Sequence, residues 1–163
     1  MSNENKSGKA KVILPVIATI VAVLSLAASL IVYNTKDFGV RRDFYFYSID
    51  KKSIAREMRY LSKDPLQGDV QLFVDELVLG PMTYRFQRIF AKGTSVEFCT
   101  LQDDVLYVGL SQDALKSASG NTVATKEELL KSIDLFKVNI VRNFTKINTI
   151  MVYIDGKSIS DDA

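Results

Sequence analysis

The feature that most constrains this chain is an uncharged apolar run near its N-terminus. Residues 12–33 read VILPVIATIVAVLSLAASLIVY and carry no charged side chain. A helix of about 20 apolar residues crosses a hydrocarbon core of roughly 30 Å. Pro15 falls in the first turn, where a missing N–H costs little. We therefore predict a transmembrane anchor over residues 12–33, preceded by a short basic cytoplasmic tail over residues 1–11.

A cleaved signal peptide is the alternative interpretation of the same run. Such a peptide has a shorter apolar region, about 7–15 residues, followed by a cleavage site of small residues. Ala27-Ala28-Ser29 is a faint candidate for that site. The length of the run favours an uncleaved anchor.

The orientation of the span is predicted from the length of the domain on its C-terminal side. Three basic residues precede the run and three come closely after it: Lys6, Lys9, Lys11, Lys36, Arg41 and Arg42. The positive-inside count is therefore a tie, but a long domain translocates largely regardless of flanking charge. We expect a single-pass protein of the cytoplasmic membrane, with a polar linker over residues 34–42 and the C-terminal domain outside the cytoplasm.

Most of the positive charge lies beside the predicted span. The whole chain has 21 basic and 19 acidic residues. Six of the basic residues, together with Glu4 and Asp37, precede residue 43, which leaves 15 basic and 17 acidic residues and a net charge of −2. This distribution suits anionic lipid headgroups near the span. It argues against a nucleic-acid partner, which needs a basic face on the domain.

The chain has no histidine and a single cysteine, Cys99. This composition excludes Ser-His and Cys-His nucleophile pairs, histidine metal sites and thiolate clusters. Cys99 lies in an apolar strand pattern, so we expect it to be buried as a small hydrophobic residue. We predict no catalytic residue, no metal site and no cofactor.

A strand is predicted over residues 43–49, which are rich in β-branched and aromatic residues. A second strand is predicted over residues 54–61, where apolar and charged residues alternate. A short helix is the alternative for the second segment. As a strand, the segment 54–61 would have two different sides, one with Ile54, Met58 and Tyr60 and the other with Glu57 and Arg59.

A helix is predicted from Asp64-Pro65-Leu66-Gln67, where Asp64 serves as the cap and Gln67 completes a capping box. One apolar face then continues at helical spacing: Leu66, Val70, Phe73, Val74 and Leu77. Gly80 is the expected left-handed stop, and Pro81 prevents continuation.

The remaining segments complete an α+β domain. A hairpin is predicted over residues 94–101 and 105–110, then a loop over 111–124. Thr125 and Glu128 form a capping box at the start of a long amphipathic helix, and a last strand covers 149–155 before a polar tail over 158–163. The order is β-β-α-β-β-α-β, with both helices packed on one face of a small sheet.

Several of these residues together resemble a known domain. They are the aromatic strand Phe44-Tyr45-Phe46, Arg59, the helix end Leu79-Gly80-Pro81, the step Lys92-Gly93-Thr94 and the strand end Asp155-Gly156. Over residues 43–157 the chain resembles the GerMN domain, the sporulation and spore germination domain. Many members have proline at the position of Lys92.

The resemblance implies a location, a role and a set of structural residues. Members sit outside the cytoplasmic membrane on an anchor or lipoprotein, resemble ring-building modules of envelope assemblies and are not known as catalysts. The implied function is a non-catalytic module that contacts other envelope proteins or copies of itself. The implied structural motif is Leu79, Gly80, Pro81, Gly93, Thr94, Asp155 and Gly156.

The loop after Pro81 holds the candidate contact surface, Tyr84, Arg85 and Arg88. Arginines beside aromatic rings bind acidic or sugar ligands, or anchor a loop to its own domain. The alternative functions are a ligand-sensing or cell-wall glycan-binding protein and, less favoured, a glycan hydrolase. A hydrolase needs two carboxyls about 5–10 Å apart across a cleft, and no acidic pair lies in an apolar context.

Overall fold

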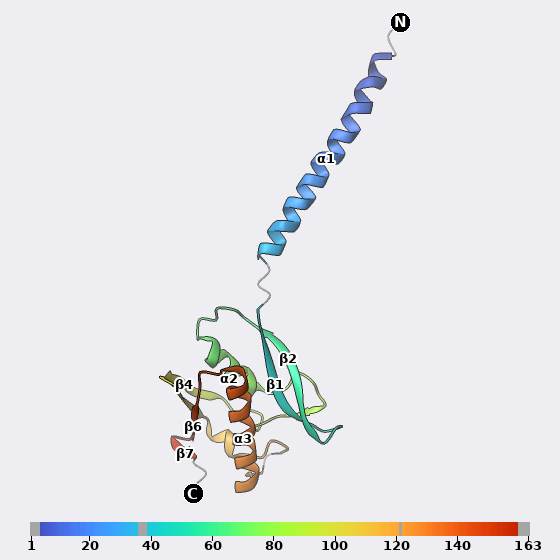
Figure 1. The fold of residues 1–163 in the computed structure, drawn as a ribbon. Helices are drawn as coiled ribbons and strands as arrows, with labels where there is room; N and C mark the ends of the chain where they lie inside the picture. Colours follow the sequence, from blue (N-terminus) through green and yellow to red (C-terminus); the bar gives the residue numbers. More distant parts are fainter. Residues whose placement is uncertain (1–3, 36–38, 121, 160–163) are drawn as a thin grey trace. The chain divides into compact units, whose positions relative to one another are not determined.

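The computed structural model describes residues 4–35, 39–120 and 122–159, which divide into an N-terminal unit and a unit from Gly39 onward. The N-terminal unit is one helix, α1 (Glu4–Thr35) (Figure 1). Its segment Pro15–Tyr33 is long and apolar enough to cross a membrane. The predicted long apolar helix is therefore present, and both an anchor and a signal sequence fit it.

The second unit, which we call the head, is an α+β domain (Figure 1). Its elements are β1 (Val40–Ser48), β2 (Ser53–Leu61), α2 (Asp69–Leu79), β3 (Phe86–Gln87), β4 (Val96–Gln102), β5 (Val105–Leu110), the 3-10 helix η1 (Gln112–Leu115), α3 (Lys126–Asn143), β6 (Thr149–Ile154) and β7 (Lys157–Ile159). The α+β class and the predicted order of long elements are confirmed. The short elements β3, η1 and β7 are additional.

Two element boundaries in the structure differ from the predicted ones. Residues 40–42, which the sequence assigned to the linker, are the first residues of β1, because its ladder with β2 begins at the pair Val40 and Leu61. At the other end, β7 takes in residues 158 and 159 of the predicted polar tail. The rest of that tail lies outside the described residues.

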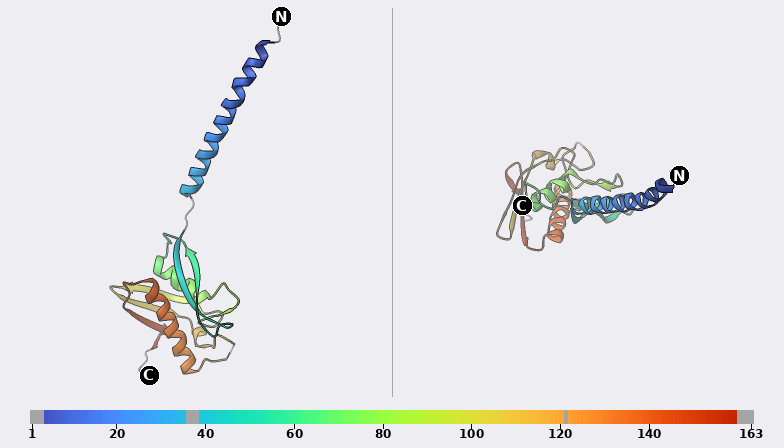
Figure 2. Two further views of the ribbon diagram at one scale, coloured as in Figure 1. Left: turned by 45° about the vertical axis from the view of Figure 1, so that its right-hand side comes forward. Right: turned by 90° about the horizontal axis from the view of Figure 1, so that it is seen from above.

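The strands form two sheets, where the sequence predicted one. The first has the order β2-β1-β3 and the second has the order β4-β5-β6-β7. β5 and β6 are parallel, and the chain between them contains η1 and α3. Figures 1 and 2 draw the two sheets apart, with α2 and α3 beside both of them. The helices therefore join two sheets: α3 contacts β1 and α2 contacts β4.

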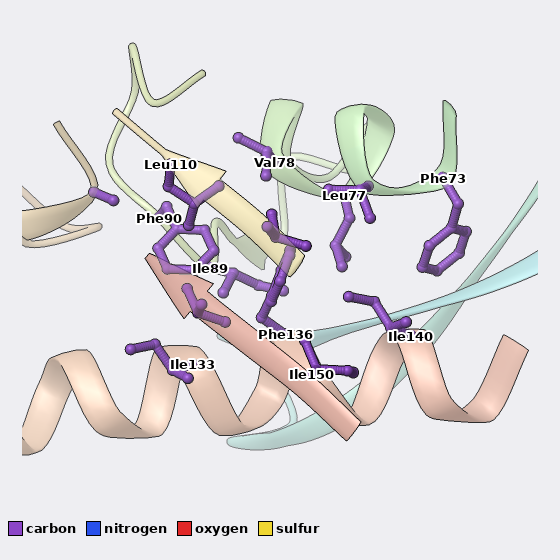
Figure 3. Packing of buried hydrophobic residues seen from close by; sticks show 14 of the residues in the cluster. Phe73, Leu77, Val78, Ile89, Phe90, Leu110, Ile133, Phe136, Ile140 and Ile150 are labelled. Carbon is purple, nitrogen blue, oxygen red and sulfur yellow. The ribbon is translucent and has the colours of Figure 1, made fainter. Parts of the chain in front are cut away.

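One apolar core connects these elements. α2, α3 and the second sheet contribute most of its side chains, and Figure 3 shows those of the two helices pointing toward a shared centre. The largest fully buried side chains are Phe44, Phe46, Phe73, Phe90, Phe136, Leu77, Leu106, Leu110, Ile133, Ile140, Ile147 and Ile154. Phe44 and Phe46 come from β1, so the first sheet shares this core with the second.

The start of α2 differs from the prediction. The helix begins at Asp69 with Gly68 as its N-cap, so Asp64 is no cap and Leu66 is fully exposed. The N–H of Gly68 donates to the carbonyl of Pro65, which closes a turn, and Gly68 has φ 90°. A positive φ is incompatible with helix, so the glycine delays the helix by one turn. The capping box of Thr125 and Glu128 at α3 is confirmed.

Candidate interaction surface

Gly80 ends α2, as the sequence predicts, but in a different conformation. Its φ is 95° and its ψ is −173°. The positive φ is confirmed, whereas the ψ lies outside the left-handed helical region, in a region that is essentially restricted to glycine. A Cβ at this position would lie 2.9 Å from Cγ of Arg88. The backbone and the close approach both require glycine.

Replacing Gly80 by valine should therefore destabilise the head by about 1 kcal/mol or more, because a β-branched residue resists a positive φ. The thermal midpoint of the head is the measurement. Gly120→Val is the matched control, since a Cβ at Gly120 meets no atom within 4 Å and its φ is not positive. Equal midpoints for the two variants would contradict the prediction.

The structure separates the three residues of the predicted contact surface. The Arg88 guanidinium donates to the carbonyl of Leu79 and lies against Gly80, so it ties the loop to the end of α2. Arg85 instead forms an exposed ion pair with Asp50, with Nη1 3.2 Å from Oδ2. Tyr84 lies next to Arg85 and is 83% exposed. Arg88 is thus a tether, while Tyr84 and Arg85 lie at the surface.

Arg59 is the centre of a buried polar cluster that the sequence did not reveal. Its side chain is only 5% exposed. The guanidinium donates to Glu57 Oε1 at 2.7 Å, to Glu76 Oε2 at 3.2 Å and to the carbonyl of Gly80 at 2.7 Å. It also lies 4.5 Å from the ring centroid of Phe44. One side chain therefore joins β2, the end of α2, the start of the loop and the aromatic core.

Glu57 extends this cluster into the loop. Its carboxylate accepts from the backbone N–H of Met82 at 3.2 Å and of Thr83 at 3.0 Å. Burial raises the pKa of Glu57, but the hydrogen bonds from Arg59, Thr83 and Met82 outweigh it and hold that pKa below its usual value. The buried carboxylate is thus ionised at neutral pH. Glu57 and Arg59 lie two residues apart in a predicted strand, so their side chains lie on the same side of it. This spacing of opposite charges was the signal in the sequence for the ion pair.

Two asparagines of α3 hold β1 in place of a neighbouring strand. Asn139 accepts from the N–H of Tyr45 at 2.7 Å and donates to its carbonyl at 2.9 Å. Asn143 contacts the N–H and carbonyl of Asp43 in the same way, at 3.1 and 2.7 Å. β3 pairs only with the last two residues of β1. The two amides satisfy the edge groups of Asp43 and Tyr45, where a further strand would otherwise pair.

β2 turns Glu57 and Arg59 inward, and its outward side carries Arg56 among large apolar side chains. Glu57 and Arg59 face the core, where they form the buried polar cluster. The opposite side, together with Tyr47 of β1, is exposed, and we call it the outer face: Tyr47 (40%), Ile54 (59%), Met58 (50%) and Tyr60 (64%). Tyr47 pairs directly with Ile54 in the ladder. Large side chains that remain exposed side by side are typical of a contact surface.

The clefts of the head offer little chemistry. Three clefts of about 250–330 Å³ each contain a single carboxylate, Glu128 in one and Asp69 in the other two. Arg88 and Tyr47 line the first of them, without Arg85. The described residues contain no group of three possible metal ligands. None of these three clefts is lined by both Arg85 and Arg88 together with aromatic rings, which a ligand pocket at the loop would require.

Cys99 is half-buried, where the sequence predicted a buried residue. Cys99 lies in β4, which is exposed along most of its length, and its side chain packs against the edge of the core. Burial and the nearby charge of Asp75 raise the pKa of the thiol to about 11. The thiol is therefore neutral at physiological pH and a weak nucleophile.

The remaining motif residues occupy turns. Gly93 has φ 101°, and both the N–H and the hydroxyl of Thr94 donate to the carbonyl of Ala91. Asp155 and Gly156 have φ 52° and 72° and form the turn between β6 and β7. These residues shape connections and bring no reactive groups together.

The comparisons with known proteins agree with this fold. The first GerMN domain of the sporulation protein GerM from Bacillus subtilis is 16% identical with a TM-score of 0.56, over 74% of this chain and 86% of that chain. The tandem GerMN domains of the same protein are 15% identical with a TM-score of 0.56, over 74% of this chain and 40% of that chain.

A putative lipoprotein from Clostridium perfringens is 18% identical with a TM-score of 0.45, over 76% of this chain and 80% of that chain. No curated protein matches the chain. A family model for "Germane: Sporulation and spore germination" matches residues 43–160, nearly the whole head and well over half of the chain. The chain therefore belongs to the Germane family of sporulation and spore germination domains.

Proposed function

We propose that the head is a non-catalytic interaction module in an envelope assembly related to sporulation or germination. The apolar run over residues 12–33 anchors it, and the head lies outside the cytoplasmic membrane. The observation that carries this proposal is the outer face, where β2 presents Ile54, Met58 and Tyr60 to solvent beside Arg56, while Glu57 and Arg59 face the core. When a partner covers exposed apolar side chains in one patch, the free energy of the system falls, which favours association.

The use of the charged groups supports a role without catalysis. Glu57 and Glu76 each form an ion pair with Arg59 inside the head. Arg88 is bonded to the backbone of α2, and an arginine stays protonated, so it cannot act as a general base. The carboxylates of the three clefts lie singly, whereas glycan hydrolysis needs two.

A glycan-binding role is the second candidate, because the exposed tyrosines Tyr47 and Tyr60 flank Arg56 on the same side of the first sheet. Aromatic rings and arginine are common in sites that bind sugars. This role predicts that the full-length chain sediments with purified cell wall and that Tyr60→Ala abolishes this sedimentation. The interaction module predicts no such sedimentation.

The proposal is tested by light-induced capture from the full-length chain in its own cells. A photoreactive phenylalanine analogue replaces Tyr60 on the outer face or, as the control, Lys126 at the exposed start of α3. We expect protein adducts from position 60 and few from position 126, because a partner covers only the outer face. The adducts should be degraded when protease is added to intact spheroplasts.

Equal capture at the two positions, or none at either, would overturn the interaction role of the outer face. Adducts that survive protease in intact spheroplasts and are lost only after lysis would place the head in the cytoplasm instead. The second result reverses the orientation and leaves the interaction role standing.

A further inference from the structure

β2 has an open edge that suits pairing with another strand. In the first sheet its neighbour on one side is β1, and no described strand pairs with its other side. β2 is nine residues long and stays in register with β1 throughout, without a bulge. Its sequence, SIAREMRYL, contains no lysine, proline or glycine. Proteins commonly block exposed edges with lysine, proline or bulges, and β2 has none of these.

Charged residues that point inward also protect some edges. In β2 these are Glu57 and Arg59, and they neutralise one another at 2.7 Å. Their remaining bonds go to Glu76, Gly80 and the loop, so neither depends on solvent at the edge. The inward charges of β2 therefore do not repel an added strand unless that strand places a like charge directly opposite one of them.

The sequence of β2 is complementary to itself in one antiparallel register. When two copies meet around a two-fold axis at Met58, residue 56 lies opposite residue 60 and residue 57 lies opposite residue 59. The outward side then pairs Arg56 with Tyr60 of the other copy, a cation beside an aromatic ring. On the inward side Glu57 lies opposite Arg59 of the other copy, so opposite charges face one another while each keeps its hydrogen bonds within its own head.

The neighbouring registers lack this complementarity. A two-fold axis at Glu57 places the two copies of Glu57 opposite one another, and an axis at Arg56 or Arg59 does the same for that arginine. Like charges directly opposite in a strand pair are destabilising. The register centred on Met58 is therefore the favoured one of the four.

We propose that a second copy of this chain binds along β2, in antiparallel pairing centred on Met58. The pairing joins two three-stranded sheets into one of six strands across a two-fold axis, an isologous contact. Met58 meets Met58 of the other copy at the centre of the combined outer face. This inference rests on the proposed interaction function and names the partner.

Disulfide formation in the full-length chain tests the register. Met58→Cys is made on a Cys99→Ser background, and cells are treated with a mild oxidant before a non-reducing gel. Ile54→Cys on the same background is the matched control, because it lies on the same strand and face and is at least as exposed. In the proposed register position 54 lies eight residues from position 54 of the other copy, about 27 Å, whereas a disulfide needs Cα atoms within about 7 Å.

We expect a disulfide-linked dimer with Met58→Cys and none with Ile54→Cys. Arg56→Cys co-expressed with Tyr60→Cys should also give a dimer, which provides a second measurement of the same register. Absence of both dimers, or equal dimers from Met58→Cys and Ile54→Cys, would overturn the pairing. If both dimers are absent while position 60 still captures another protein, the self-pairing is wrong and the proposed function stands. If both dimers are absent and position 60 captures nothing, the self-pairing and the proposed function are both wrong.

Discussion

Replacing Arg59 by alanine should lower the free energy of unfolding of the head by about 3–5 kcal/mol, the range for breaking one side of a buried ion pair. The loss is large because the guanidinium lies between two carboxylates, a backbone carbonyl and an aromatic ring. Without it, the Glu57 carboxylate loses its counter-ion and keeps only the hydrogen bonds from the loop, and the carbonyl of Gly80 loses its donor. The loop after α2 should then lose its fixed position.

Urea denaturation of wild type and variant gives this difference. Arg56→Ala is the control, since Arg56 lies on the same strand but is more than half exposed and forms an ion pair with Asp43 at 3.3 Å. An exposed ion pair contributes about 1 kcal/mol or less. If the two alanine variants lose equal stability, the buried cluster does not hold the loop. Arg59→Lys should restore only part of the loss, because an ammonium lacks the planar fork.

Replacing Asn139 by leucine should lower the free energy of unfolding by about 2–6 kcal/mol, because the N–H and carbonyl of Tyr45 are left without partners and each unpaired buried group costs roughly 1–3 kcal/mol. Asn139 is completely buried, so water cannot replace the amide. Leucine has a similar size, so the loss reports the hydrogen bonds more than a cavity. The same denaturation experiment measures it.

Asn143→Leu is the matched control for Asn139→Leu. Asn143 makes the equivalent two bonds to β1 through Asp43, but it is half-buried and one turn closer to the end of α3. Water can reach the freed groups there, so the loss should be clearly smaller. A loss for Asn143→Leu as large as that for Asn139→Leu would show that burial does not set the cost.

The two clusters explain how the outer face stays available. Arg59 holds the β1–β2 pair from its inner side through ion pairs, and Asn139 holds it at the edge of β1 through hydrogen bonds to the backbone. The hairpin therefore does not need the apolar side chains of β2 for its attachment to the head. Ile54, Met58 and Tyr60 can stay at the surface, where they serve contact with a partner in the function that we propose.

Local patterns in the sequence were sufficient for the elements whose signals lie within a few residues. The apolar run predicted α1, the Thr125–Glu128 capping box predicted the start of α3, and alternation predicted β2. The combination of these elements predicted the α+β class, and the quoted motif residues identified the family that the comparisons confirm. Each of these signals is a periodicity or a short-range hydrogen bond, which the chain carries without its distant contacts.

Only the tertiary structure decided where those elements meet. Alternation in β2 indicates two sides but does not tell which one faces the core, and here the side with the Glu57–Arg59 ion pair faces inward. The division into two sheets depends on Asn139 and Asn143, which reach β1 from about 94–100 residues away in the chain. Arg88 and Arg85 look alike in the sequence, yet one donates to a helix end and the other to an exposed carboxylate. The partner of a polar side chain is set by long-range packing, because many donors and acceptors satisfy the same local pattern.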